Sequence, residues 1–274
     1  MTQLNKAVVL ITGASGGFGQ ELTRQLLQAG SRLILTDLDE AVLRQRVEVI
    51  QRQVATGEVL ACLSNDLSNN SGCEILYRQV KALNIPIDIL INNAGIAISG
   101  RLDEIPLESG ERLMQINLLT PIRLSALFAT DMIARQQGHI VNISSLAGWC
   151  GFPGLSHYTA SKFGLRGFSE CFFQEVKDYN VKVTAVYPFF SRTPILQSQG
   201  FGSFSKVNLD VIENLATDPA KVMRATIQGI IHNKLHVFPD ATAKTAHLLK
   251  RYFPQIVNRI NDAFVRRVKS GKGE

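Results

Sequence analysis

The stretch Ala7-Val8-Val9-Leu10-Ile11-Thr12-Gly13-Ala14-Ser15-Gly16-Gly17-Phe18-Gly19 decides the fold. Its first five residues form a short apolar run, typical of a strand that is buried on both faces in a parallel sheet. The glycines predict a turn, and a helical pattern then continues to Ala29, with Gly30 as its C-terminal stop. A strand, a glycine turn and a helix N-terminus together predict an anion site, where bare backbone and free N–H groups face a pyrophosphate. A purely structural turn stays open as the alternative, because glycine motifs often match by chance.

A second stretch, Ser144 to Lys162, carries the candidate chemistry. Tyr158 and Lys162 are four residues apart and therefore lie on one face of a predicted helix. We expect the ammonium to favour the phenolate and to lower the tyrosine pKa from its usual value of about 10, which makes the phenol a usable acid or base. Ser145 follows a predicted strand, His139 to Ile143, so its hydroxyl can point at the same reacting oxygen. A Tyr-x-x-x-Lys pair by itself is more often a solvated helix face.

Taken together with Asn117 and the glycine turn, these motifs resemble the short-chain dehydrogenase/reductase family, in its compact single-domain, NAD-type branch. The resemblance covers about residues 6–193. It implies that Tyr158 exchanges a proton with an alcohol or ketone and that Lys162 also binds the nicotinamide ribose. It further implies that Ser145 holds the substrate oxygen and that Asn117 completes a proton relay through a water molecule.

The implied function is an NAD(H)-dependent oxidoreductase that interconverts an alcohol and a ketone or aldehyde. Two alternatives stay open. One is a non-catalytic dinucleotide-binding regulator or scaffold with the same fold. The other is an NADP(H)-dependent carbonyl reductase.

The resemblance also implies a set of cofactor-binding residues in the glycine turn and at the ends of later strands. Asp37 ends the predicted strand Arg32–Thr36, where a carboxylate accepts hydrogen bonds from the adenosine ribose and repels a 2′-phosphate. No basic residue lies in the glycine turn and Leu38 follows Asp37, so NAD(H) is favoured over NADP(H). The full set is Gly13, Ser15, Gly17, Phe18, Gly19, Asp37, Asp66, Leu67, Asn93, Ala94, Gly95, Tyr158, Lys162, Pro188 and Thr193. The sequence departs from the family at Phe189, where a glycine usually follows the proline.

The order of apolar runs and helical patterns predicts a doubly wound α/β Rossmann fold, with a mostly parallel sheet of seven strands and helices on both faces. We expect a catalytic domain over residues 1–240, with a lid at about 190–217, and a basic amphipathic helical extension over 241–274. The helical pattern of residues 108–137 is predicted to be interrupted near Thr120-Pro121.

Composition and charge narrow the function classes. The chain of 274 residues is 45% hydrophobic and 19% charged, as in globular proteins. Its net charge of +6 lies entirely in the extension, which holds eight Lys/Arg and two acids, so we expect no nucleic-acid partner. The four cysteines and five histidines lack metal-ligand spacing, which predicts no metal. With no apolar run of spanning length and no room for a signal peptide before Ala7, we expect a cytoplasmic protein.

Two further expectations concern partners. Six aromatic residues flank the predicted reaction site: Trp149, Phe152, Phe189, Phe190, Phe201 and Phe204. They favour a bulky apolar alcohol or ketone, such as a steroid, retinoid or lipid derivative, unless half of them belong to the core. The apolar stripe of the extension either packs on the protein, as part of a lid or a subunit contact, or lies on an anionic membrane. The family resemblance implies a homodimer or homotetramer.

Overall fold

The computed structural model describes residues 1–204 and 213–255, and in this part of the chain seven strands form one parallel sheet. The strands are β1 (Val8–Thr12), β2 (Arg32–Asp37), β3 (Glu58–Ser64), β4 (Ile89–Asn92), β5 (Gly138–Ile143), β6 (Val181–Val186) and β7 (His236–Val237). Their spatial order is β3-β2-β1-β4-β5-β6-β7, with parallel pairing throughout. The predicted doubly wound fold is therefore confirmed, and the order of the strands reverses between β1 and β4.

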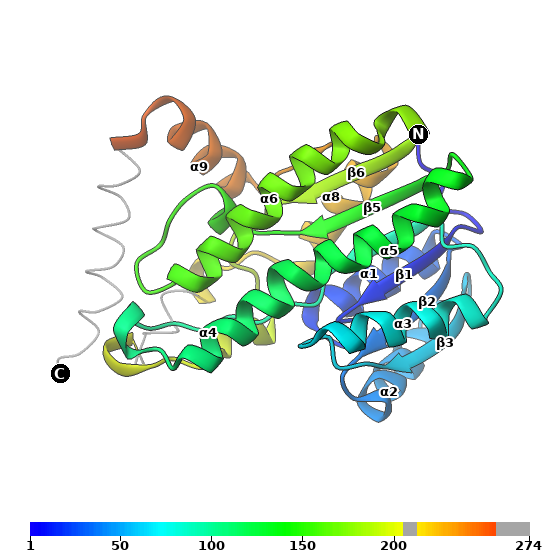
Figure 1. Cartoon of the computed structure of the whole chain (residues 1–274), viewed down its shortest axis with the longest axis horizontal. Coiled ribbons are helices and arrows are strands. Elements are labelled where there is room, and N and C mark those ends of the chain that lie inside the picture. Colours follow the sequence, from blue (N-terminus) through cyan, green and yellow to red (C-terminus); the bar gives the residue numbers. More distant parts are fainter. Residues whose placement is uncertain (205–212, 256–274) are drawn as a thin grey trace.

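Helices cover both faces of the sheet (Figure 1). They are α1 (Gly17–Gln28), α2 (Glu40–Gln51), α3 (Asn70–Ala82), α4 (Leu107–Met114), α5 (Thr120–Ala134), α6 (Ser156–Val176), α8 (Pro219–Ile231) and α9 (Ala241–Tyr252). Alternate residues of each strand point to opposite faces, so β1 contributes Val9 and Ile11 to a core with α1, α2 and α8. Its Val8 and Leu10 enter the second core, with α3, α5 and α6.

The long helical pattern after β4 differs from the prediction. The helix does not break at Thr120-Pro121 but continues from α4 to α5 through a π-helical turn, Gln115–Leu119. Pro121 is tolerated because it lies in the first turn of α5, directly after the wider π turn. By length and composition alone, Leu107–Ala134 is also long and apolar enough to cross a membrane, but half of its most apolar window is buried inside the protein.

The C-terminal region contains the helices α8 and α9. Asp218 caps α8 by accepting a hydrogen bond from the Ala220 N–H, and Pro219 occupies the first helical position. The described part of the extension, α9, packs on the protein, since Ala246 and Leu249 contact the apolar cluster around Leu146. The rest of the predicted extension, residues 256–274, lies outside the described residues.

Candidate functional site

The carboxyl ends of the parallel strands meet at one edge of the sheet, and a cavity of about 870 Å³ lies there. Of the predicted cofactor residues all but Gly19 line it, and so does Ser145. Segments far apart in the sequence meet at this edge because each directly follows a strand end: the glycine turn follows β1, Asp37 ends β2, and Asn93 follows β4. The strand ends that the sequence predicted therefore meet at this wall of the cavity.

The glycine turn is held open by close contacts that exclude side chains. Gly13 has φ +64°, and a Cβ atom there would lie 2.7 Å from the Ala94 Cα. A Cβ atom on Gly17 would lie 2.5 Å from the Thr193 Cγ2, so these two predicted cofactor residues touch. Gly19 packs inside the turn instead, because a Cβ atom there would lie 2.2 Å from the Gly13 oxygen. Its role is to shape the turn and not to line the cavity.

The adenosine end of the cavity is bounded by Asp37 and by a residue that the sequence reading missed. The Asp37 carboxylate accepts hydrogen bonds from the Ser15 N–H (2.9 Å), the Ser15 hydroxyl and the Leu38 N–H (2.8 Å). Arg46, from α2, donates a hydrogen bond to the Ser15 carbonyl and lines the same cavity. We looked for basic residues only in the glycine turn and directly after Asp37, and we therefore missed Arg46, a cation that can pair with a 2′-phosphate. Arg46 lies nearly two helical turns into α2, away from the end of β2.

At the other end of the cavity lie Tyr158, Lys162 and Ser145. Tyr158 is partly exposed on the cavity wall, whereas Lys162 is buried. The Lys162 Nζ donates to the Ile143 carbonyl (2.9 Å) and lies 5.7 Å from the centroid of the Tyr158 ring. The Ser145 hydroxyl accepts a hydrogen bond from the Ala147 N–H (3.1 Å), which fixes it just past the end of β5.

The pKa values in this group differ from the expectation. Burial raises the pKa of the Tyr158 phenol above its ordinary value, and a hydrogen bond with Ser145 lowers it by less. Burial also lowers the pKa of Lys162, to about 8. The predicted lowering of the Tyr158 pKa by Lys162 is therefore wrong for this arrangement, because burial dominates and the smaller lowering effect comes from Ser145 and not from Lys162. A phenol that stays protonated at neutral pH can donate a proton to a carbonyl oxygen.

Asn117 lies in the π-helical turn and is fully buried, away from the cavity wall. Its side-chain oxygen accepts from the Ile96 N–H (2.9 Å), and its amide group donates to the Ile96 carbonyl (2.9 Å) and to the Ser161 hydroxyl (3.3 Å). Asn117 therefore clamps the segment after β4 against α6. Its role in a water-mediated proton relay stays a prediction.

The predicted aromatic set divides into two groups. Phe152, Phe189 and Phe190 line the cavity, as do apolar residues of the segment that follows β4. Trp149 instead packs among Tyr187, Phe238 and His247, and Phe201 packs against a small cluster around Ile98. The side chain of Phe204 lies outside the described residues.

Arg192, a cation in the loop after β6, is turned away from the cavity. Its guanidinium donates to the Ala216 carbonyl (2.5 Å), and it is not among the residues that line the cavity. The reaction end of the cavity is therefore walled mainly by apolar groups.

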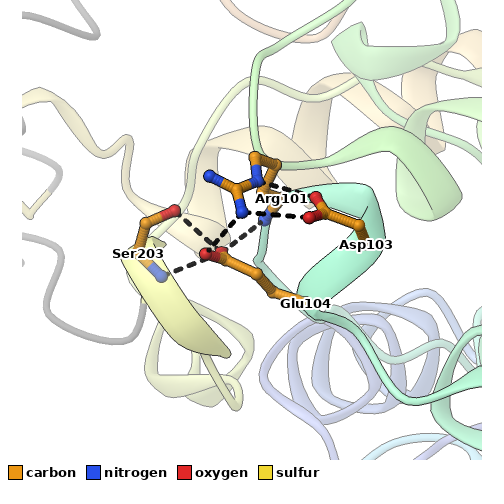
Figure 2. Close-up of polar contacts among 4 residues, drawn as sticks. All are labelled: Arg101, Asp103, Glu104 and Ser203. Atoms are coloured by element: carbon orange, nitrogen blue, oxygen red, sulfur yellow. Dashed lines mark hydrogen bonds and ion pairs between the residues drawn. The ribbon is translucent and has the colours of Figure 1, made fainter.

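Figure 2 shows how the described part of the lid is attached to the segment after β4. Glu104 accepts hydrogen bonds from the Ser203 N–H (2.9 Å) and hydroxyl (2.8 Å), and Arg101 pairs with both Glu104 and Asp103. Next to these side chains, the Ser99 carbonyl accepts from the Phe201 N–H (2.7 Å). The hydrogen bonds from Ser203 hold the pKa of Glu104 below its usual range, so the carboxylate is charged at neutral pH.

Within residues 1–204 and 213–255, no group of three or more His, Cys, Asp or Glu side chains is placed to bind a metal ion. The polar groups at the reaction end of the cavity are the phenol, the ammonium and the hydroxyl described above. A cavity at the strand ends, a glycine turn and a tyrosine beside a lysine form the arrangement expected of a dinucleotide-dependent oxidoreductase.

Comparison with known proteins identifies the family. Residues 7–201 match the model of the short chain dehydrogenase family, so the chain belongs to that family. The 3-ketodihydrosphingosine reductase of Bos taurus is 35% identical over 190 residues, which cover 69% of this chain and 57% of that protein. The chain thus spans little more than half the length of this relative. Epidermal retinol dehydrogenase 2 of Homo sapiens is 31% identical over 250 residues, covering 90% of this chain and 78% of that protein.

A solved structure supports the same assignment. A metagenomic short-chain oxidoreductase in complex with NADP is 36% identical, with a TM-score of 0.64, over 68% of this chain and 84% of that protein. The fold and the family are thus established.

Proposed function

We propose that the protein interconverts a bulky apolar ketone, or aldehyde, and its alcohol with a nicotinamide dinucleotide, and that it favours reduction at neutral pH. The observation that carries this proposal is the position of Tyr158 on the cavity wall, with Ser145 and the buried Lys162 close by. Burial raises the pKa of the Tyr158 phenol, which favours its protonated form at neutral pH. The dinucleotide supplies or accepts a hydride when it is bound. The protein supplies the proton, the orientation of the substrate and the exclusion of water.

Each of the three residues has a distinct part in the reduction. Ser145 donates a hydrogen bond to the substrate carbonyl oxygen and so places it beside the phenol. Tyr158 transfers its proton to that oxygen as the hydroxyl forms, and it takes the proton back in the reverse reaction. Lys162 holds the ribose next to the nicotinamide, and its charge stabilises the phenolate left on Tyr158.

An apolar substrate is supported by the shape and composition of the reaction end. Phe152, Phe189 and Phe190 face the cavity, and Arg192 does not. The names of the two relatives point the same way, since one is a reductase of a ketosphingosine and the other a retinol dehydrogenase. A panel of steroid, retinoid and long-chain ketones, measured beside small sugars and hydroxy acids, tests this proposal. Turnover confined to the small polar compounds would refute it.

For the cofactor we propose NAD(H), because the Asp37 carboxylate at the adenosine end repels a 2′-phosphate. A specific observation favours NADP(H) as the second candidate: Arg46 lies on the same cavity wall and can pair with a phosphate. The two are separated by titrating NADH and NADPH into the wild type, Asp37→Ala and Arg46→Gln. We expect tighter binding of NADH by the wild type and a smaller difference in Asp37→Ala. Tighter binding of NADPH that is lost in Arg46→Gln would assign the cofactor to the second candidate.

We further propose a cytoplasmic homodimer or homotetramer without a nucleic-acid partner. The membrane alternative for the extension is tested with anionic and neutral vesicles, using the full chain and a version that ends at Asp240. Binding to anionic vesicles that weakens with salt and vanishes on truncation supports the membrane. Loss of the oligomer in light scattering, without vesicle binding, supports packing on the protein.

A further inference from the structure

The loop after β6 has its backbone groups fixed from several sides. It runs from Tyr187 to Thr193 and lines the cavity from Pro188 onward. The Pro188 carbonyl accepts a hydrogen bond from the Leu146 N–H (2.9 Å), and the Phe190 carbonyl accepts one from the Thr217 N–H (2.8 Å). Buried backbone groups need such partners, so these bonds determine where the loop lies against the cavity.

A further bond of this loop comes from Asp240, the last residue of the predicted catalytic domain. The Phe189 N–H donates to Oδ2 of Asp240 (3.0 Å). The other oxygen of the same carboxylate, Oδ1, accepts from the Ala243 N–H (2.7 Å) and caps the N-terminus of α9. One half-buried side chain thus joins the cavity wall to the start of the C-terminal helix.

The substitution of the usual glycine by Phe189 fits this arrangement. Phe189 does not have a positive φ, so the position does not require glycine. Phe189 packs against the cluster of Leu146 and Cys150, and from α9 Ala246 and Leu249 pack against the same cluster. Helix α9 therefore supports both the loop after β6 and the loop that carries Ser145, and Figure 1 shows it beside the segment that leads into α6.

We propose that Asp240 is a positioning residue of the reaction site. Its carboxylate fixes the Pro188–Phe190 backbone at the nicotinamide end of the cavity and at the same time starts α9, so that α9 forms part of the active-site wall. The proposal rests on the proposed function only for where the nicotinamide lies. It places the functional boundary of the catalytic domain beyond residue 240, in contrast to the division that the sequence suggested.

Asparagine at position 240 separates the two bonds. Asn is as good a helix cap as Asp, but it has a single acceptor oxygen. Asp240→Asn therefore keeps the cap of α9 and turns an NH₂ group toward the Phe189 N–H, whereas Asp240→Ala loses both bonds. Asp218 provides the matched control, because it caps α8 through the Ala220 N–H, and Asp218→Asn leaves that cap in place.

Three measurements report on the two hydrogen bonds of Asp240, and none of them needs the ketone. Trp149 is the single tryptophan of the chain, and its ring lies 4.2 Å from that of His247 on α9, so its fluorescence reports whether α9 is docked. Amide hydrogen exchange at Phe189 reports the bond itself. Titration with NADH and NADPH gives the affinity of the cavity for the cofactor. The catalytic constants are then measured on the best ketone of the panel.

For Asp240→Asn we expect wild-type Trp149 emission, faster exchange at Phe189 and weaker binding of the preferred cofactor. The loss of one charge-assisted hydrogen bond corresponds to roughly a tenfold change in affinity and in kcat/KM. Asp218→Asn should leave all of these values within twofold of the wild type. An Asp240→Asn protein with wild-type exchange at Phe189 and wild-type cofactor affinity would overturn the proposal.

A second variant excludes the simpler role of Asp240 as a helix cap. Leu249→Ala weakens the packing of α9 without touching either bond of Asp240. If Asp240→Asn loses affinity only together with the change in Trp149 emission that Leu249→Ala shows, Asp240 is only a cap and the inference fails. A wild type that binds the cofactor but reduces no ketone would refute the proposed function, while the exchange and binding results would still decide this proposal.

Discussion

Gly17→Ala tests whether the glycine turn and the loop after β6 meet as the structure shows. A Cβ atom at residue 17 would lie 2.5 Å from the Thr193 Cγ2 and 2.7 Å from its Cβ, whereas ordinary contacts begin at 3.4 Å. Thr193 would therefore have to move by about 0.9 Å, judged from these distances. Overpacking of this kind costs about 1–3 kcal/mol, partly offset by the better helix propensity of alanine. A net loss of about 1 kcal/mol lowers the melting temperature by roughly 2–4 °C in a domain of this size.

Gly167→Ala is the matched control, because residue 167 lies in α6 and a Cβ atom there meets nothing within 4 Å. It should stabilise the protein by up to about 1 kcal/mol, the opposite sign. Calorimetry measures both variants, and titration with NADH and NADPH should show about tenfold weaker cofactor binding for Gly17→Ala, since Thr193 is displaced. A Gly17→Ala protein that melts like Gly167→Ala and binds cofactor like the wild type would refute the close approach.

The remaining predictions concern the lid, the proton donor and a buried histidine. Glu104→Gln weakens the hydrogen bonds between Glu104 and Ser203, so KM for the ketone should rise about threefold to tenfold while kcat changes little. Asp103→Asn is the control and should match the wild type, because Asp103 pairs with Arg101 and not with the described part of the lid. Because the pKa of Tyr158 is raised, alcohol oxidation should still increase above pH 8, whereas ketone reduction should fall there as Lys162, with a pKa of about 8, loses its charge; parallel pH profiles would contradict this. His139 is buried, and its pKa is lowered from 6.5 to about 3 in the folded protein. Between these two pH values the unfolded chain binds a proton at His139 and the folded protein does not, so the free energy of unfolding should decrease as the pH drops from 6.5 toward 3. The loss amounts to roughly 5 kcal/mol over that window, and acid denaturation of His139→Gln should lack it.

The sequence predicted well what depends on local pattern and on the ends of strands. The run from Ala7 to Gly19 shows strand, turn and helix in order, and parallel pairing then brings every strand end to one edge. Asp37 ends β2, so it could be placed at this edge from the pattern, whereas Tyr158 was assigned to the site through its spacing to Lys162 and the family resemblance. Their local geometry needs no knowledge of distant contacts.

The residues that the sequence placed wrongly depend on tertiary packing. Arg46 reaches the cavity only because α2 crosses back over the turn at Ser15, a direction that no local pattern encodes. Trp149 was predicted near the substrate, but α9 covers it from more than ninety residues away. The pKa of Tyr158 depends on how deeply the whole fold buries it, and spacing to Lys162 carries no such information.

The measurement that tests the account most directly is hydride transfer by Tyr158→Phe. The wild type and the variant are mixed with reduced cofactor and the best ketone of the panel, and single-turnover oxidation of the cofactor is followed by absorbance. Because phenylalanine keeps the ring and removes the proton donor, the rate should fall by about 10²–10⁴-fold while the cofactor affinity stays unchanged. A variant that oxidises the cofactor at a near-native rate would contradict the assignment of Tyr158 as the acid.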